Sequence, residues 1–234
     1  MYVYGKNVVK TLIEKNKKIK KAYIADNFSD NIILDKLKSL DVETKVLSKN
    51  ELDKIENGNH QGIIIETQDY KYLNEKDMFS NMKKNPFIVI LDHLEDPHNF
   101  GAIIRTCEAS GVDFIIIPKD RSVSVNSTVV KTSVGAVYNV KIVIVTNLNN
   151  TIKKLKDNGL WIVGTDMENS ILYDEIDYTI PVAIIIGNEG RGIKDLVRKN
   201  CDFVARIPMI GEVNSLNASV AAGIMIYEVL RQRK

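Results

Sequence analysis

The sequence predicts an α/β protein with a small N-terminal α/β unit and a larger C-terminal domain built on a parallel sheet. In the C-terminal part, short continuous apolar runs rich in β-branched residues alternate with stretches of helical spacing. Continuous runs of this length are typical of strands buried on both faces, and the alternation predicts helices on both sides of the sheet. The 44% hydrophobic and 26% charged content is ordinary for a globular chain and argues against disorder.

Residues 1–70 alternate between helical and extended patterns. Apolar residues at helical spacing predict helices over 5–15 and 32–40. Ser48 and Glu51 have the spacing of a capping box and predict a short helix that ends at Ile55. Extended segments with turn residues between them are the predicted strands of this unit: Lys21–Ala25, Val42–Leu47 and Gly62–Thr67.

A polar stretch over residues 71–85 is a predicted linker, so the predicted domains are 1–70 and 86–234. Helices are predicted over 99–110, 149–158 and 217–232, and the last of these is apolar nearly all round its first half. We expect such a helix to be buried, and a subunit interface is one place where it could be buried. The predicted strands of this domain are the five apolar runs Phe87–Leu91, Phe114–Ile117, Lys141–Val145, Trp161–Gly164 and Val182–Ile186.

Several classes of protein are disfavoured by what the sequence lacks. No apolar run approaches the roughly 18 residues of a membrane helix, and the N-terminus has no secretory signal, so a cytoplasmic protein is expected. Cys107 and Cys201 form no CxxC pair and have no nearby histidine cluster, so no metal site is expected. Buried or incidental thiols are favoured over a catalytic cysteine.

The net charge of +2 does not indicate a nucleic-acid-binding protein, but the N-terminus is basic. Its cluster of lysines, accompanied only by Glu14, could meet phosphates or form a solvated helix face. His60 and Gln61 lie in a turn that could contact RNA, or His60 could be a hydrogen-bonded turn residue. The lysines of this cluster are Lys6, Lys10, Lys15, Lys17, Lys18, Lys20 and Lys21.

A glycine-rich segment, Gly187–Gly192, follows the most apolar predicted strand. Its G-x-x-G-x-G spacing is neither the dinucleotide fingerprint nor a phosphate-binding P-loop. Glycine allows backbone to approach a ligand closely, and the carboxylate of Glu189 favours a polar site over an ordinary tight turn.

Two further segments follow predicted strands, where α/β sheets bind ligands. In the first, Asn99 is a predicted helix cap, and Arg105 lies in an apolar stretch. An arginine in such a stretch needs a partner, which could be Glu189, another acid or a ligand. In the second, Ser215 is the predicted cap of the last helix, with Asn217 as the alternative.

These three segments resemble the three motifs of the SpoU (TrmH-type) RNA 2′-O-methyltransferases. They read LDHLEDPHNFGAIIRTCEASGVD, IIIGNEGRG and IPMIGEVNSLNASVAAGI, with PKDRS and WIVGTD between them. YGKNVV and HQGI are similar to the family's small substrate-binding domain. The resemblance implies a SPOUT-type parallel sheet with a deep trefoil knot, an L30e-like N-terminal domain, S-adenosyl-L-methionine (AdoMet) as cofactor, and a homodimer formed through the catalytic domain.

The resemblance also implies roles for individual residues. Arg105 would activate the ribose hydroxyl. Because guanidinium stays protonated, Arg105 could instead bind a phosphate and stabilise the alkoxide. The residues implied for catalysis or RNA positioning are Asn99, Arg105, Glu189, Ser215 and Asn217. Those implied for cofactor binding are Thr165, Gly187, Ile207, Met209, Ser215 and Leu216.

Within this family, the sequence looks most like the bacterial enzymes that methylate a guanosine ribose in 23S ribosomal RNA. It carries GNEGRG where those enzymes have a GAEGEG form. Family alternatives are a tRNA 2′-O-methyltransferase and an antibiotic-resistance rRNA methyltransferase. Alternatives from other classes are a catalytically inactive RNA-binding module and a nucleotide-binding α/β protein; AdoMet binding would separate both from the main prediction.

Overall fold

The computed structural model describes residues 1–188 and 190–234. They form two compact units, one of Met1–Lys71 with Val125–Asn139 and the other of Tyr72–Ser124 with Val140–Lys234. The segment Val125–Asn139, which the sequence analysis placed in the C-terminal domain, therefore groups with the N-terminal residues. None of the helices described is both long and apolar enough to span a membrane.

The first unit is a four-stranded sheet with the order β1-β4-β2-β3. Strands β2 and β3 are parallel, whereas β4 runs antiparallel to both β1 and β2. The capping box predicted at Ser48 is present at the start of α3. The strands are β1 (Tyr2–Tyr4), β2 (Ile19–Ala25), β3 (Thr44–Leu47) and β4 (Ile63–Thr67). The helices are α1 (Lys6–Glu14), α2 (Asn31–Ser39), α3 (Lys49–Ile55), α6 (Ser127–Thr132) and the 3-10 helix η1 (Ala136–Tyr138).

The second unit is built on a parallel sheet of seven strands with the order β7-β6-β5-β10-β8-β11-β9. All five predicted strands are present, and they are consecutive in the sheet, from β7 at one edge to β8. The strands are β5 (Phe87–Leu91), β6 (Phe114–Pro118), β7 (Ile142–Val145), β8 (Trp161–Thr165), β9 (Ile171–Leu172), β10 (Val182–Ile186) and β11 (Phe203–Arg206). The predicted α/β fold with a parallel sheet is confirmed, while the trefoil knot stays a prediction.

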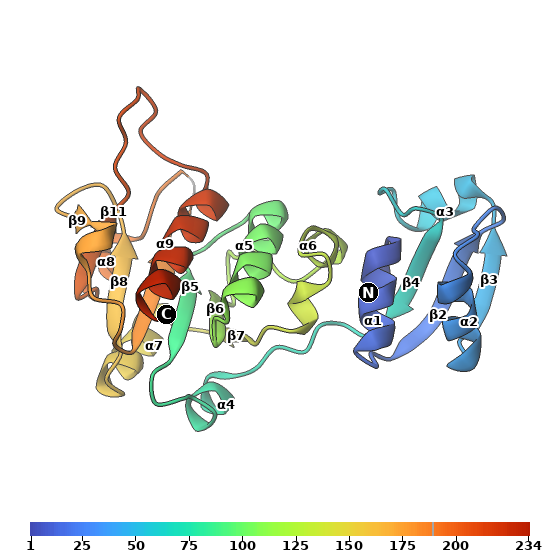
Figure 1. Cartoon of the computed structure of the whole chain (residues 1–234), viewed down its shortest axis with the longest axis horizontal. Coiled ribbons are helices and arrows are strands. Elements are labelled where there is room, and N and C mark those ends of the chain that lie inside the picture. Colours follow the sequence, from blue (N-terminus) through green and yellow to red (C-terminus); the bar gives the residue numbers. More distant parts are fainter. Residues whose placement is uncertain (189) are drawn as a thin grey trace. The chain divides into compact units, whose positions relative to one another are not determined.

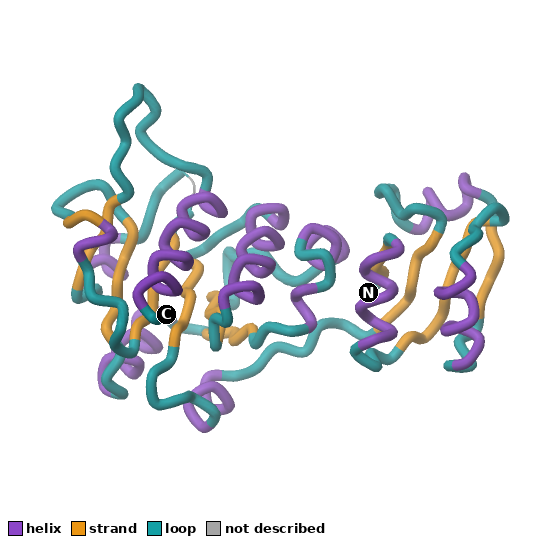
Figure 2. The backbone as a smooth tube through the Cα atoms, viewed as in Figure 1, coloured by secondary structure: helices purple, strands orange, loops and turns teal. Residues whose placement is uncertain are grey.

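Helices surround this sheet, and α5 lies beside α9 (Figures 1 and 2). The predicted linker contains α4, which begins after the side-chain cap Asn74 and buries Met78. The helices are α4 (Glu75–Ser80), α5 (Pro97–Ser110), α7 (Leu148–Asp157), η2 (Tyr173–Glu175), α8 (Asp195–Lys199) and α9 (Ala218–Gln232). Strands β8, β10 and β11 are close neighbours in the parallel sheet. The segments that follow them therefore meet beyond the carboxyl ends of these strands.

Candidate functional site

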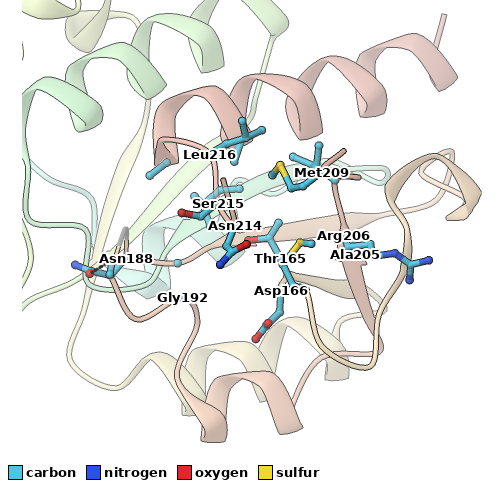
Figure 3. A pocket seen from close by; sticks show the side chains of 17 residues that line it. Thr165, Asp166, Asn188, Gly192, Ala205, Arg206, Met209, Asn214, Ser215 and Leu216 are labelled. Carbon is cyan, nitrogen blue, oxygen red and sulfur yellow. Dashed lines mark hydrogen bonds between the residues drawn. The ribbon is translucent and has the colours of Figure 1, made fainter. Parts of the chain in front are cut away.

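A pocket of about 290 Å³ lies at the carboxyl ends of β8, β10 and β11 in the second unit, beside the start of α9 (Figure 3). Its walls come from the segments that follow β8, β10 and β11. The lining residues are Thr165, Asp166, Met167, Ile186, Gly187, Asn188, Gly190, Gly192, Ala205, Arg206, Ile207, Met209, Asn214, Ser215, Leu216, Ala218 and Ala221. Apolar walls with a few polar groups are typical of small-molecule sites.

All six residues expected to contact a cofactor line this pocket: Thr165, Gly187, Ile207, Met209, Ser215 and Leu216. They come from three separate stretches of sequence, and parallel pairing of β10, β8 and β11 brings these stretches together. The hydroxyl of Thr165 donates to the backbone oxygen of Ile185, which fixes the end of β8 to β10. Sequence reasoning missed Asp166 and Asn214, although each lies next to a predicted residue.

Two charged residues at the pocket are held by partners outside it. The carboxylate of Asp166 forms an ion pair with Nη1 of Arg198 at 3.3 Å. Arg206 donates from Nη1 to the backbone oxygen of Ser170, and its guanidinium points away from Asn214 and Ser215 in Figure 3. Among the described lining residues, Thr165, Asn188, Asn214 and Ser215 offer uncharged polar groups, while the Arg206 guanidinium points away from Asn214 and Ser215.

A pair of backbone hydrogen bonds closes the glycine-rich turn directly after Gly187. Asn188 and Gly192 exchange two backbone hydrogen bonds, of 3.1 and 2.9 Å. A Cβ atom placed on Gly187 would lie 2.2 Å from the backbone carbon of Gly192, well inside van der Waals contact. Glycine is thus required at 187 to close the turn, a reason that differs from the expected approach of backbone to a ligand.

A buried polar network that the sequence analysis missed ties this turn to β5. Asp92, which is 1% exposed, accepts from the backbone N–H of Lys194 at 2.9 Å and contacts Nδ1 of His93 at 2.5 Å. Nζ of Lys194 lies 2.9 Å from Nε2 of His93, and the Asn188 side chain donates to the His93 carbonyl at 3.0 Å. Because an ammonium only donates, Nε2 is the acceptor in the contact with Lys194, and Nδ1–H can donate to Asp92. The network holds both ends of the turn.

The structure brings together Asn99 and Asn217 from the first and third motifs. Nδ2 of Asn217 donates to Oδ1 of Asn99 at 2.9 Å, and Asn99 is 7% exposed. Oδ1 of Asn217 also accepts from the backbone N–H of Ser219 at 2.9 Å. Asn217 is therefore the cap of α9, and the prediction that Ser215 caps this helix is wrong.

The prediction that Asn99 caps α5 is also wrong. The helix begins at Pro97, and its cap is Asp96, whose carboxylate accepts from the N–H of His98 at 2.8 Å. Proline at the first helical position lacks only an N–H that would be unsatisfied there in any case. Asn99 therefore lies inside the first turn, where its side chain can reach Asn217.

Arg105 is exposed on α5, although its neighbours Ile104 and Cys107 are buried. The expectation that it lies among core residues is wrong, because it occupies the solvent side of the helix. Among residues 1–188 and 190–234, Arg105 forms no ion pair within 4 Å. The predicted site residue Glu189 lies outside the described residues.

Both cysteines are free thiols. Burial raises the pKa of Cys107 far above its usual range. Burial, helped by the nearby Asp202 carboxylate, raises the pKa of Cys201 to about 12. Because the thiolate is the nucleophilic form, neither cysteine has the properties of a catalytic one.

Comparison with known proteins identifies the family. Residues 86–227 match the SpoU rRNA Methylase family, and residues 2–73 match the domain described as RNA 2′-O ribose methyltransferase substrate binding. A TrmH family tRNA/rRNA methyltransferase of Staphylococcus saprophyticus is 45% identical, over 99% of this chain and 95% of the relative. The TrmH family protein YacO of Bacillus subtilis is 39% identical, over 99% of this chain and 96% of the relative.

Solved structures agree with this assignment. The AdoMet-bound rRNA methyltransferase of Sinorhizobium meliloti is 27% identical, with a TM-score of 0.82 over 98% of this chain and 86% of that one. The TrmH/SpoU tRNA modifying enzyme of A. aeolicus is 33% identical, with a TM-score of 0.59 over 68% of this chain and 83% of that one. The chain therefore belongs to the SpoU rRNA methylase family of RNA methyltransferases.

Proposed function

We propose that the protein transfers a methyl group from AdoMet to a ribose 2′-hydroxyl of 23S ribosomal RNA, at a guanosine. The observation that carries the proposal is the single pocket into which all six expected cofactor residues converge. The relative from Sinorhizobium meliloti, described as an rRNA methyltransferase, was crystallised with AdoMet bound. A ribosomal RNA substrate would place the protein in the cytoplasm.

The residues of the pocket fit AdoMet. Ile186, Ile207 and Leu216 offer apolar surface for a planar base. Thr165 and Ser215 offer hydroxyls that would hold the polar groups of AdoMet, and the Arg206 guanidinium is engaged by the backbone oxygen of Ser170. When bound, AdoMet supplies an activated methyl group on a positively charged sulfur.

The protein must then position and activate the ribose hydroxyl. Asn99 and Asn217 are held by their mutual hydrogen bond and can orient the substrate at the start of α9. Arg105, exposed on α5, has a guanidinium available for a substrate phosphate or for the developing alkoxide. Holding the reacting atoms in line supplies much of the remaining acceleration.

Two measurements on the full-length protein test the proposal. Calorimetry should show AdoMet binding, which an inactive RNA-binding module would lack. Mapping of ribose methylation in cells without this gene should show one 23S position that loses its methyl group. Loss of a tRNA methyl group instead, with 23S rRNA unchanged, would contradict the proposed substrate and support the tRNA alternative.

We also propose a homodimer formed through the catalytic domain. Ile226 and Val229, two of the apolar residues of α9, are buried within the chain. Val220 and Tyr227 are 50% and 52% exposed on the same helix, which gives it apolar surface beyond that used by its own core. Together with the family membership, this surface supports self-association.

Sedimentation at micromolar concentration is expected to show a dimer that Val220→Asp weakens about tenfold or more, since an unpaired carboxylate is costly to bury. Val46→Asp is the matched control, because Val46 is an exposed valine on β3 of the first unit. A fully active wild-type monomer at this concentration would rule out the dimer.

A further inference from the structure

The first unit contains a hollow of about 520 Å³ that the methyl-transfer site does not use. It lies where the loop after β2 and the loop before β4 meet the N-terminal ends of α1 and α3. Its lining residues are Lys6, Ala25, Asn27, Phe28, Ser29, Lys49, Asp53, Gly58, Asn59, His60, Gln61 and Gly62. We refer to it as the Phe28 pocket.

Several lysines of the basic N-terminal cluster are neutralised by acids. Lys10 pairs with Asp30 at 3.3 Å, and Lys20 pairs with Glu66 at 3.6 Å. Lys21 pairs with Glu43. These pairs lower the positive charge that the sequence cluster offers to phosphates.

Two lysines at the Phe28 pocket differ from these. Lys6 and Lys49 both line it, and within the described part of the chain neither forms an ion pair. The one carboxylate in the lining, Asp53, is engaged by Nε2 of His60 at 3.0 Å. The pocket therefore brings two lysines without an ion pair together with one carboxylate, Asp53, so its lining has a net positive charge that favours an anion.

Phe28 is a half-buried ring held in a fixed place. It packs against the cluster formed by Tyr4, Ala25, Leu52 and Ile64. A Cβ atom on Gly62 would come within 3.2 Å of its Cδ2 atom, so the glycine lets the backbone lie against the ring. Nζ of Lys6 lies 5.2 Å from the ring centroid. The Lys6 ammonium thus lies over a face of the ring, and a base that stacks on this face takes its place.

His60 shapes this pocket and has no ring nitrogen left for a ligand. It is 5% exposed, Nδ1 accepts from the N–H of Gly62 at 3.0 Å, and Nε2 contacts Asp53. The structure therefore supports the hydrogen-bonded turn residue rather than direct RNA contact by His60. Asn27, Ser29 and Asn59 are exposed at the rim and can hydrogen-bond to a base.

We propose that the Phe28 pocket receives an unpaired nucleotide of the RNA substrate. Its base stacks on Phe28, and its flanking phosphates meet Lys6 and Lys49. A base inside a duplex is stacked on its neighbours, so only a bulged, looped or terminal nucleotide can reach the ring. The inference rests on the proposed function, because it assigns to the first unit a part of the same RNA substrate.

Fluorescence anisotropy of the full-length protein tests this inference with two labelled RNA hairpins that differ only by a one-nucleotide bulge. The wild type is expected to prefer the bulged hairpin. Phe28→Leu should weaken binding of the bulged hairpin about tenfold and remove the preference, because base stacking on an aromatic ring is lost. Phe28→Tyr keeps the ring and should retain both.

The lysines give an independent test by salt dependence. Lys6→Ala should lower the slope of log affinity against log salt by about 0.7 to 0.9, the loss of one phosphate contact. Lys20→Ala is the matched control, since Lys20 lies outside the lining and pairs with Glu66. If Phe28→Leu is unstable in a thermal melt, Lys6→Ala and Lys49→Ala carry the test.

Equal binding of the two hairpins by the wild type would overturn the inference, as would unchanged salt slopes in both lysine variants. AdoMet calorimetry on the same proteins separates this failure from failure of the proposed function. A wild type that binds AdoMet but ignores the bulge contradicts only the Phe28 pocket, whereas one without AdoMet affinity contradicts the proposed function.

Discussion

Gly187→Ala is expected to weaken AdoMet binding about 5- to 150-fold. The added Cβ would lie 2.2 Å from the Gly192 carbonyl carbon and 2.5 Å from the Ile193 nitrogen, and backbone atoms cannot move aside as a flexible side chain can. Overpacking of this kind costs about 1–3 kcal/mol. Since 1.4 kcal/mol is a factor of ten in affinity, a bound state that needs the closed turn loses affinity in that range.

Gly190→Ala is the matched control, because Gly190 lines the same pocket but the nearest described atom to its Cβ would be Oδ1 of Asn188, at 3.8 Å. Its affinity for AdoMet should stay close to that of the wild type. Calorimetry on both variants, with circular dichroism to confirm folding, makes the comparison. A folded Gly187→Ala protein with unchanged affinity would show that the 187–192 turn does not form the cofactor site.

Most of the second unit's sheet could be predicted because its central strands are buried on both faces. The ranges Phe87–Leu91 and Val182–Ile186 are those predicted, since continuous apolar runs mark such strands. Strands β9 and β11 were missed because they lie toward one edge and are only partly buried, so their sequences lack that signal. The order of strands is set by contacts far apart in the chain, which local patterns do not encode.

Local signals also explain the errors at helix ends. Asn99 and Ser215 are residue types that cap helices, but other residues nearby cap these two helices. Asp96, followed by Pro97, caps α5, and Asn217, which accepts from the N–H of Ser219, caps α9. The helix α4 was assigned to a linker because its six residues give little periodicity, although Met78 anchors it in the core. The burial of a single residue such as Met78 is decided by tertiary packing, which a local sequence pattern does not reveal.

The lining of the pocket beside α9 was predicted in part from the family resemblance, while the residues that support it were not. Thr165, Gly187 and Leu216 lie in segments that resemble the family's motifs, and the resemblance implied their contact with a cofactor. The Asp92–His93–Lys194 network joins residues about a hundred positions apart, and nothing in either segment marks the pairing. The exposure of Arg105 likewise depended on which face of α5 packs against its neighbours.

Arg105→Ala is expected to lower the rate of methyl transfer by about 10²–10⁴-fold while leaving folding and AdoMet affinity unchanged. The exposed position of Arg105 separates this result from a structural effect. A buried ion pair, the alternative that the sequence left open, would cost about 3–5 kcal/mol of stability when broken. Removal of an exposed side chain should change stability by only about 0.5 kcal/mol.

Arg105→Lys then distinguishes the two ways in which arginine can act. Lysine keeps the positive charge but loses the planar guanidinium. If charge alone stabilises the alkoxide, Arg105→Lys should retain partial activity, and if two-point binding of a phosphate is needed, it should be nearly as slow as Arg105→Ala. Single-turnover reactions at saturating RNA and AdoMet measure the chemical step without differences in binding.

Lys153→Ala, which removes an exposed cation from α7, is the control and should react at the wild-type rate. A folded Arg105→Ala protein that reacts as fast as this control would exclude a catalytic role for the arginine and leave the activation of the hydroxyl to Asn99, Asn217 or the substrate itself.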